Sequence, residues 1–336
     1  MSRLADLRDR ANRCEQPLSA FLELTYSCNW RCVFCFNSRH HDLAPLSVDE
    51  WRDVLVGLRS LGTLHVTLTG GEPLTHPAFF AIAEAARSLF FALRIFTNGA
   101  LIDADTAARI SGLHPAGVEL SLHGAIAPTH DRVTGRAGSF DTLLRAVRGL
   151  QSRDVPLLLK TPLTRHNELE IEGMVGLARR LGVPYQIDPR LTPKDNGDPS
   201  PLALSASPEG AESVTGILGA DGPVPSDRKR RLGEPHCALG RSTLAVDPEG
   251  NVYPCIQWRQ TTLGNVRDAS IAELWRSAPS RKEAAKVAVR ANDQVVTLGS
   301  SIGTGTFCPA LAFQVSGDPI GRPGLLNRES PGDRAP

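Results

Sequence analysis

Three cysteines, Cys28, Cys32 and Cys35, lie close together directly after an apolar, strand-like run. Thiolates ligate iron–sulfur clusters, and three of them on one short loop can hold three irons of a cubane. The fourth iron then has no protein ligand and is free to bind a small molecule. Two other interpretations stay open, a three-cysteine zinc site and buried structural thiols. Zinc prefers four protein ligands in a closed structural site, and only His40 and His41 lie nearby as candidates for the fourth.

The cysteine spacing, C-x3-C-x2-C, resembles that of the radical S-adenosylmethionine (SAM) superfamily. The resemblance implies that the open iron chelates the amino and carboxylate groups of SAM, and that Phe34 packs near the adenine. It also identifies Gly70-Gly-Glu-Pro73 as the motif that receives the SAM amino group. Glycine lets the backbone approach a ligand closely, and the carboxylate of Glu72 can accept hydrogen bonds from an ammonium. Alone, Gly70, Gly71, Glu72 and Pro73 are also typical of an ordinary strand-to-helix turn.

Three more positions are implied by the resemblance. Thr97 and Ser121 end predicted strands and match hydroxyl groups that contact SAM in related enzymes, although each could instead satisfy its own backbone. Ile187, late in the last predicted strand, matches a position that packs on the adenine. These residues extend the expected SAM site along the ends of several strands.

The segment 130–135 resembles a stretch of the peptide-modifying and haem-maturing branches of the superfamily. Many members carry arginine where this chain has Thr134, and that arginine helps to hold the SAM carboxylate. Arg132 is the candidate to replace it. A loop that caps a helix explains the same segment equally well.

Apolar, β-branched runs alternate with amphipathic segments over the first 190 residues. We predict strands at 21–25, 64–69, 92–96, 118–122, 157–161 and 185–188. We predict helices at 47–61, 78–89, 104–110, 139–151 and 168–181, the first with a capping box at Ser47 and Glu50 and the last stopped by Gly182. This alternation indicates an α/β fold with a parallel sheet, in which ligands bind at the carboxyl ends of the strands. Six βα units are too few for a closed eight-stranded barrel, so we predict a partial (β/α)6 TIM-like barrel, which is also the fold of the superfamily.

The composition changes after residue 190. We predict an N-terminal extension at 1–18, the barrel at 19–190, a linker at 191–235 with one short helix near 209–218, a small α+β domain at 236–319 and a flexible tail at 320–336. The small domain starts with a predicted hairpin, 242–246 and 251–255, which turns at Asp247-Pro-Glu-Gly250. The chain therefore has two predicted units, of which the barrel carries the cysteine loop.

Cys237, Cys255 and Cys308 stand in sequence contexts that resemble a SPASM or twitch domain, which holds auxiliary [4Fe–4S] clusters. A full SPASM domain has cysteines for two clusters, whereas this chain offers three, so one auxiliary cluster with an incomplete thiolate set is the limit. Its fourth ligand could be a carboxylate, His236, water or the substrate. The alternative is a domain without a cluster, in which the three thiols are buried core residues. Cys14 is expected to be a bystander.

Composition excludes several classes of function. The formal net charge of the 336 residues is +1, and the basic clusters are short, which argues against a nucleic-acid partner. The N-terminus is charged and polar, unlike a signal peptide, and no apolar run is long enough to span a bilayer. Seven cysteines in such a chain indicate metal or redox use in the cytosol, not disulfides.

The resemblance implies reductive cleavage of SAM to a 5′-deoxyadenosyl radical, which abstracts hydrogen from the substrate. The SPASM-like branch favours modification of a ribosomally made peptide or protein by cross-linking, epimerisation or decarboxylation. Tetrapyrrole side-chain tailoring of the haem or haem-d1 type is the second hypothesis, and a non-catalytic iron–sulfur or zinc scaffold is the third. Expected partners are a low-potential electron donor such as flavodoxin or ferredoxin and, for a peptide, a separate leader-binding protein. About 20 residues precede the first strand, too few to bury a core of their own.

Overall fold

A computed structural model describes residues 3–218, 231–298 and 307–321 of the chain. Six parallel strands form its central part and are all close to their predicted positions: β1 (Ser19–Glu23), β2 (His65–Thr69), β3 (Ala92–Thr97), β4 (Gly117–Ser121), β5 (Leu157–Pro162) and β6 (Tyr185–Asp188). The helices that alternate with them are α2 (Val48–Ser60), α3 (Phe79–Ser88), α4 (Ala104–Gly112), α5 (Ala127–Thr134), α6 (Ser139–Gln151) and α7 (Ile171–Leu181). Short 3₁₀ turns lie at Pro73–Thr75, Glu168–Glu170 and Ser200–Leu204.

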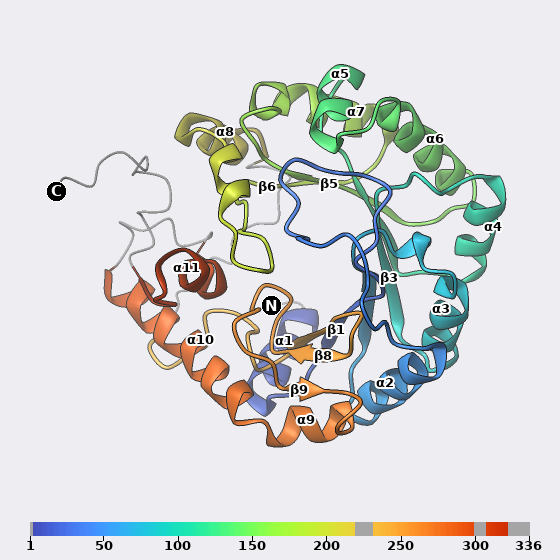
Figure 1. Ribbon diagram of the computed structural model, residues 1–336. Coiled ribbons are helices and arrows are strands. Elements are labelled where there is room, and N and C mark those ends of the chain that lie inside the picture. The colour runs from blue at the N-terminus through green and yellow to red at the C-terminus, as the bar shows by residue number, and fades with distance from the viewer. Residues whose placement is uncertain (1–2, 219–230, 299–306, 322–336) are drawn as a thin grey trace.

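The sheet has nine strands in the order β6-β5-β4-β3-β2-β1-β7-β8-β9 and does not close on itself. The helices α2 to α7 form an outer arc around the strands (Figure 1). The predicted partial barrel is therefore confirmed. Since all strands from β6 to β7 run in parallel, the loops that follow β1 to β6 gather at one edge of the sheet, where a ligand site is expected.

Strand residues alternate between two very different surroundings. One set is apolar and fully buried against the outer helices; it includes Leu22, Leu68, Ile95, Leu120 and Leu159. The intervening residues face the inside of the open barrel and are largely polar or aromatic: Glu23, Thr69, Phe96, Glu119, Ser121, Lys160 and Asp188. The apolar set holds the helices on the sheet, which leaves the inner face available for chemistry.

Local signals fix the ends of two helices as predicted. The hydroxyl of Ser47 accepts a hydrogen bond from the backbone N–H of Glu50, whose carboxylate accepts one from the N–H of Ser47. These bonds confirm the capping box at the start of α2. Gly182 ends α7 with φ of +66°, a left-handed conformation that favours glycine.

The C-terminal unit continues the sheet of the barrel instead of forming a separate one. Its strands are β7 (Thr243–Val246), β8 (Asn251–Tyr253) and β9 (Gly264–Asn265), and its helices are α9 (Ile271–Ser277), α10 (Pro279–Leu298) and α11 (Pro309–Ser316). The predicted hairpin is confirmed, because β7 and β8 pair in antiparallel fashion. Strand β7 also pairs with β1 in parallel, so β1 is an interior strand.

The predicted N-terminal extension packs on the C-terminal unit. It contains the helix α1 (Arg3–Cys14), in which the carbonyl of Asn12 accepts a hydrogen bond from Arg241 at 3.3 Å. The indole N–H of Trp275 donates to the carbonyl of Glu15 at 2.9 Å, and Arg281 pairs with the Glu15 carboxylate at 2.8 Å. The segment needs no core of its own because it uses that of its neighbour.

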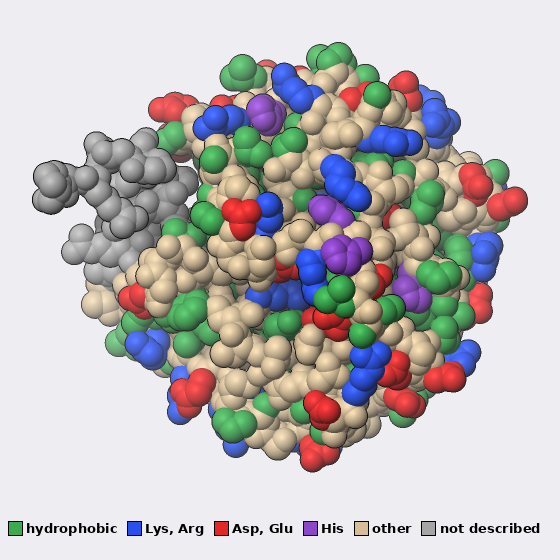
Figure 2. Space-filling model, viewed as in Figure 1, with side chains coloured by type: hydrophobic (Ala, Val, Ile, Leu, Met, Phe, Trp, Pro, Cys, Tyr) green, Lys and Arg blue, Asp and Glu red, His purple; other side chains and the backbone are tan. Residues whose placement is uncertain are grey.

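The predicted linker holds the helix α8 (Pro208–Leu218), as expected, while its residues 219–230 lie outside the described part of the chain. The same holds for 322–336, most of the predicted flexible tail. No helix among the described residues is long and apolar enough to cross a membrane. Basic and acidic side chains are interspersed on the face that Figure 2 shows.

Candidate active site

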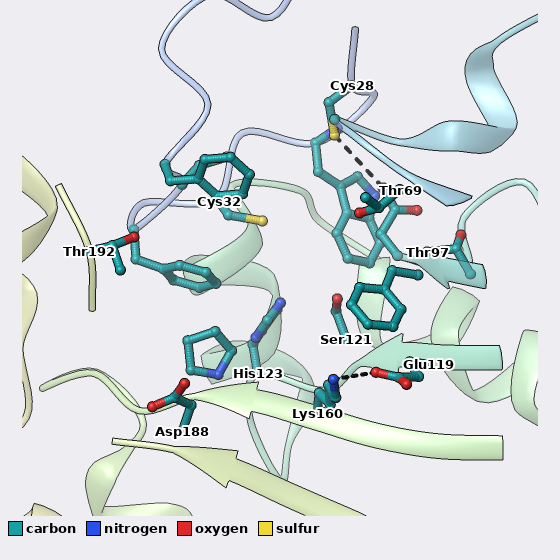
Figure 3. A pocket seen from close by; sticks show the side chains of 18 of the residues that line it. Cys28, Cys32, Thr69, Thr97, Glu119, Ser121, His123, Lys160, Asp188 and Thr192 are labelled. Atoms are coloured by element: carbon teal, nitrogen blue, oxygen red, sulfur yellow. Dashed lines mark hydrogen bonds and ion pairs between the residues drawn. The ribbon is translucent and has the colours of Figure 1, made fainter. Parts of the chain in front are cut away.

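A cavity of about 340 Å³ lies at the carboxyl ends of the parallel strands. Its wall contains all three cysteines of the first loop, strand-end residues from β2 to β6 and one residue of the C-terminal unit, Gln257. Figure 3 shows Cys28 and Cys32 on one side of the cavity, Lys160 and Glu119 on the opposite side and His123 between them. A cavity of this size is typical of small-molecule sites.

The cysteine loop is held against β2 by backbone contacts. The N–H of Gly71 donates to the carbonyl of Thr25 at 2.7 Å, and the N–H of Glu72 donates to that of Ser27 at 2.9 Å. A side chain at Gly71 would lie 2.3 Å from the Ser27 oxygen, and one at Gly70, where φ is +137°, would lie 2.3 Å from the Thr25 oxygen. Both glycines are therefore required for the close approach of the two segments.

Burial raises the pKa of the three thiols, that of Cys35 to about 11. The thiols stay protonated at neutral pH unless a bound cation stabilises the thiolates. The sulfur of Cys28 already accepts a hydrogen bond from the N–H of Trp30 at 3.4 Å. A donor set of three buried thiols facing a cavity fits an iron–sulfur cluster with one open iron.

A single zinc ion fits less well. Among the described residues, no three side chains of His, Cys, Asp or Glu lie close enough to hold one metal ion. A cubane is larger than a single ion, so its thiolate ligands stand farther apart. This arrangement disfavours the three-cysteine zinc site that the sequence left open.

Glu72 has a different environment from the one expected. Its side chain is completely buried and does not line the cavity. The carboxylate accepts hydrogen bonds from the hydroxyl of Thr97 at 2.7 Å, the N–H of Asn98 at 2.7 Å and the N–H of Leu74 at 3.1 Å. Burial nevertheless raises its pKa to about 7. The carboxylate thus positions the end of β3, while the Gly70–Gly71 backbone faces the cavity.

The other residues implied by the resemblance divide into two groups. Phe34, Thr97 and Ser121 line the cavity. Pro73 and Ile187 do not, because both are buried, and alternation along β6 points Ile187 to the outer helices and its neighbour Asp188 to the cavity.

Arg132 is not part of the cavity wall either. Its exposed side chain donates to the carbonyl of His166 at 3.3 Å. In the same segment, Asp131 accepts hydrogen bonds from the N–H groups of Gly138 at 2.6 Å and Phe140 at 3.0 Å, at the start of α6. These hydrogen bonds are those expected of a loop that caps a helix.

A charged group on the inner face was missed in the sequence. The buried carboxylate of Glu119 pairs with Arg94 at 2.7 Å and with Lys160, whose ammonium also lies 4.4 Å from the centre of the Phe96 ring. On β6, Asp188 pairs with Arg190 at 3.1 Å. Alternation along the strands could have identified these residues, because all but Arg190 occupy inner-face positions of strands.

The second cysteine set lies in the C-terminal unit. Cys255 and Cys308 pack on one apolar cluster, which includes Leu239 and Trp258. The ring of His236 binds the carbonyl of Phe307 at 2.9 Å, which brings the segment of the exposed Cys237 next to that of Cys308. Burial raises the pKa of Cys255 to about 11. The three segments therefore converge, and the contact that joins two of them uses the Nε2 atom of His236. Cys14, by contrast, is exposed at the end of α1.

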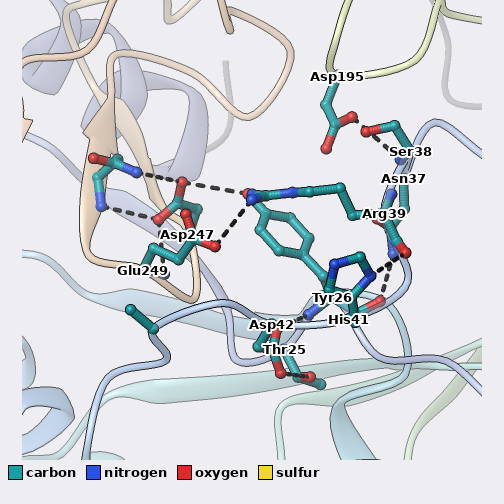
Figure 4. A network of polar contacts seen from close by, with 12 residues as sticks. Thr25, Tyr26, Asn37, Ser38, Arg39, His41, Asp42, Asp195, Asp247 and Glu249 are labelled. Carbon is teal, nitrogen blue, oxygen red and sulfur yellow. Dashed lines mark hydrogen bonds and ion pairs between the residues drawn. The ribbon is translucent and has the colours of Figure 1, made fainter.

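Polar contacts join this unit to the cysteine loop (Figure 4). Arg39 pairs with Glu249 of the hairpin at 3.0 Å, and the hydroxyl of Tyr26 lies 3.3 Å from the carboxylate of Asp247. Deeper inside, Arg259 pairs with Glu23 at 2.6 Å, and both side chains are almost fully buried. The hairpin thus helps to fix the loop that carries the first three cysteines.

Comparison with known proteins agrees with this geometry. Residues 22–178 match the radical SAM superfamily, and residues 237–297 match SPASM, an iron–sulfur cluster-binding domain. Mycofactocin maturase MftC of Mycobacterium ulcerans is 29% identical over 79% of this chain and 76% of its own length. PqqA peptide cyclase of Rhodopseudomonas palustris is 30% identical over 78% and 74%, and AdoMet-dependent heme synthase of Methanosarcina barkeri is 27% identical over 76% and 81%.

Among solved structures, Streptococcus suis SuiB bound to its precursor peptide SuiA superposes with a TM-score of 0.67 at 16% identity, over 83% of this chain and 69% of that one. This likeness shows a common fold. A non-catalytic scaffold is not supported, because the related proteins are enzymes. The chain therefore belongs to the radical SAM superfamily, as an enzyme that uses SAM and iron–sulfur clusters and carries a C-terminal SPASM domain.

Proposed function

We propose that this enzyme modifies a ribosomally made peptide or protein. The observation that carries the proposal is the composite wall of the cavity, where the cysteine loop faces Lys160, Asp188 and Gln257. This leaves room for a substrate between the SAM site and the SPASM domain. Similar proteins that are named as a PqqA peptide cyclase and a mycofactocin maturase support a peptide as that substrate.

Cys28, Cys32 and Cys35 would hold the cluster that binds SAM, with the Gly70–Gly71 backbone beside the amino group. When bound, the cluster would supply one electron to SAM, which would yield the carbon radical that abstracts a hydrogen atom from the substrate. The protein must exclude water and other hydrogen donors from that step. Trp30, Phe34, Phe96 and Pro162 line the cavity and serve this purpose.

Polar side chains on the wall opposite the cysteines would position the substrate. Glu119 shares its single negative charge between Arg94 and Lys160, so this group keeps one excess positive charge. Lys160 has three N–H donors and is about one third exposed. It would therefore bind a carboxylate or a backbone carbonyl of the peptide.

Cys237, Cys255 and Cys308 would hold one auxiliary cluster in the domain at 236–319. The fourth ligand would be a carboxylate, His236, water or the substrate; one ring nitrogen of His236, Nε2, binds a backbone carbonyl, as is usual for a histidine that ligates a metal through its other nitrogen. A low-potential flavodoxin or ferredoxin would supply electrons, and a separate protein would bind the leader of the peptide. The seven free cysteines fit a cytosolic location.

The test is release of 5′-deoxyadenosine, measured by liquid chromatography–mass spectrometry with anaerobically reconstituted, reduced protein. The variant Cys28/Cys32/Cys35→Ala should release none, whereas the matched control Cys14→Ala, which alters an exposed cysteine, should behave as wild type. Short peptides encoded beside the gene should stimulate release and gain a mass change.

Tetrapyrrole tailoring is the second candidate, because a heme synthase is among the similar proteins. The same assay with sirohaem derivatives separates the two candidates. Stimulation by a sirohaem derivative and by no peptide would overturn the peptide proposal in favour of the tetrapyrrole.

A further inference from the structure

His123 lies two residues beyond the end of β4, on the wall of the cavity (Figure 3). Its side chain has a fixed orientation because rings pack on two sides. The centre of the Phe34 ring is 5.0 Å away at an interplanar angle of 70°, and that of the His130 ring is 5.6 Å away. Only 3% of the residue is exposed, so a group that binds it must already lie inside the cavity.

The two stacked histidines differ in their hydrogen bonds. The Nδ1 atom of His130 binds the hydroxyl of Ser139 at 3.0 Å, and its Nε2 atom binds the carbonyl of Ser121 at 3.3 Å. The Nδ1 atom of His123 is buried and has no hydrogen-bond partner in the described part of the chain. Buried polar atoms are normally paired, so an unpaired one beside a cavity indicates a contact that a ligand completes.

The charge state of His123 restricts what that ligand group can be. Burial and the nearby His130 hold the pKa of His123 well below its usual value of 6.5. The ring is therefore neutral at pH 7 and offers one N–H donor and one acceptor. A neutral, desolvated ring suits a neutral hydrogen-bonding group better than an ion. In SAM, the methionine end carries the charges, while the adenine and ribose present neutral nitrogen atoms and hydroxyls.

We propose that His123 hydrogen-bonds the adenosine end of SAM and helps to determine the affinity for it. Its contact with Phe34, which lies between two cysteines of the loop, places the ring beside the cysteine loop. The inference goes beyond the proposed function, because it holds whether the substrate is a peptide or a tetrapyrrole.

Two variants whose side chains have the same number of heavy atoms and the same branching provide the test. His123→Asn keeps a polar atom near the position of Nδ1, whereas His123→Leu removes it, and both remove the ring contacts equally. The Kd for SAM is measured by isothermal titration calorimetry on cluster-loaded protein. Loss of one hydrogen bond should weaken SAM binding about 2- to 12-fold in the Leu variant relative to the Asn variant.

Analogues of SAM then locate the contact. If His123 binds the base, S-inosylmethionine should bind wild type more weakly than SAM does but should bind the Leu variant no differently. If it binds the ribose, the 2′-deoxyribose analogue of SAM should show this pattern instead. Iron content and the thermal midpoint of both variants report whether the cluster and the fold are intact.

Equal Kd values for SAM in the two folded variants would overturn the proposal. A wild-type Kd in both, combined with 5′-deoxyadenosine release that no longer yields product, would also overturn it, because the ring would then contact the substrate. If the Leu variant does not fold, His123→Phe supplies a second apolar variant that keeps an aromatic ring. A wild-type Kd in that variant would again overturn the proposal.

Discussion

Replacement of Gly71 by alanine should damage the SAM site by a steric route. The new methyl group would lie 2.3 Å from the carbonyl oxygen of Ser27 and 2.6 Å from that of Tyr26. Carbon atoms rarely approach closer than 3.0 Å, so the backbone just before Cys28 must move by at least 0.7 Å. Such overpacking costs about 1–3 kcal/mol. Two backbone hydrogen bonds, from Gly71 to Thr25 and from Glu72 to Ser27, are strained as well, at about 1 kcal/mol each.

The expected loss is thus about 3–5 kcal/mol in the free energy of unfolding. Since typical domains are stable by about 5–15 kcal/mol, the variant should fold, with a lower thermal midpoint. The displacement is local to the cysteine loop, so iron content and SAM affinity should fall with it. Gly112→Ala is the matched control, because no atom lies within 4 Å of the added methyl group at the end of α4. Wild-type iron content and thermal midpoint in Gly71→Ala would refute this reasoning.

Three further predictions concern titration, charge and iron. The pKa of Glu72 is about 7 in the folded protein, whereas its ordinary value is 4.5. The stability that its protonation contributes is therefore fully present below pH 4.5 and is lost as the pH rises through 7. The free energy of unfolding, measured with denaturant as a function of pH, should fall by about 3 kcal/mol over this range in wild type and by less in Glu72→Gln. The same pH dependence in both proteins would contradict this prediction. Arg259→Met leaves the buried Glu23 carboxylate without its partner and should lower the free energy of unfolding by about 3–5 kcal/mol. Adding Glu23→Gln should restore part of this stability. A double variant no more stable than Arg259→Met would count against the importance of the ion pair. Iron analysis should show less iron in Cys255→Ser and no change in Cys14→Ser, and equal iron in both would argue against the auxiliary cluster.

The sequence was sufficient for the barrel because its signals are local and repetitive. Each strand of the barrel is a short apolar run before a turn, and Ser47 with Glu50 mark a helix start without any tertiary information. The meeting of the cysteine loop with Gly70 and Gly71 was also predictable, since both follow the ends of parallel strands. These parts of the site follow from the order of the elements along the chain.

The orientation of individual side chains could not be predicted from the sequence. A glutamate after two glycines can point to a ligand or to a neighbouring strand, and only the position of Thr97 and Asn98 decides for Glu72. The burial of Ile187 in the core could have been predicted from alternation along β6. The packing of α1 on the C-terminal unit rests on contacts across more than 200 residues, such as that of Glu15 with Trp275, which no local pattern encodes.

The pairing of β1 with β7 has a consequence for the synthesis of the chain. Ser19 of β1 is the partner of Thr243, which the ribosome adds 224 residues later. At about 5–20 residues per second, one edge of β1 stays unpaired for roughly 10–45 s. An exposed strand edge can pair with another chain, so the nascent protein is vulnerable to aggregation during that time. Expression yield should therefore respond to holding chaperones and to translation speed.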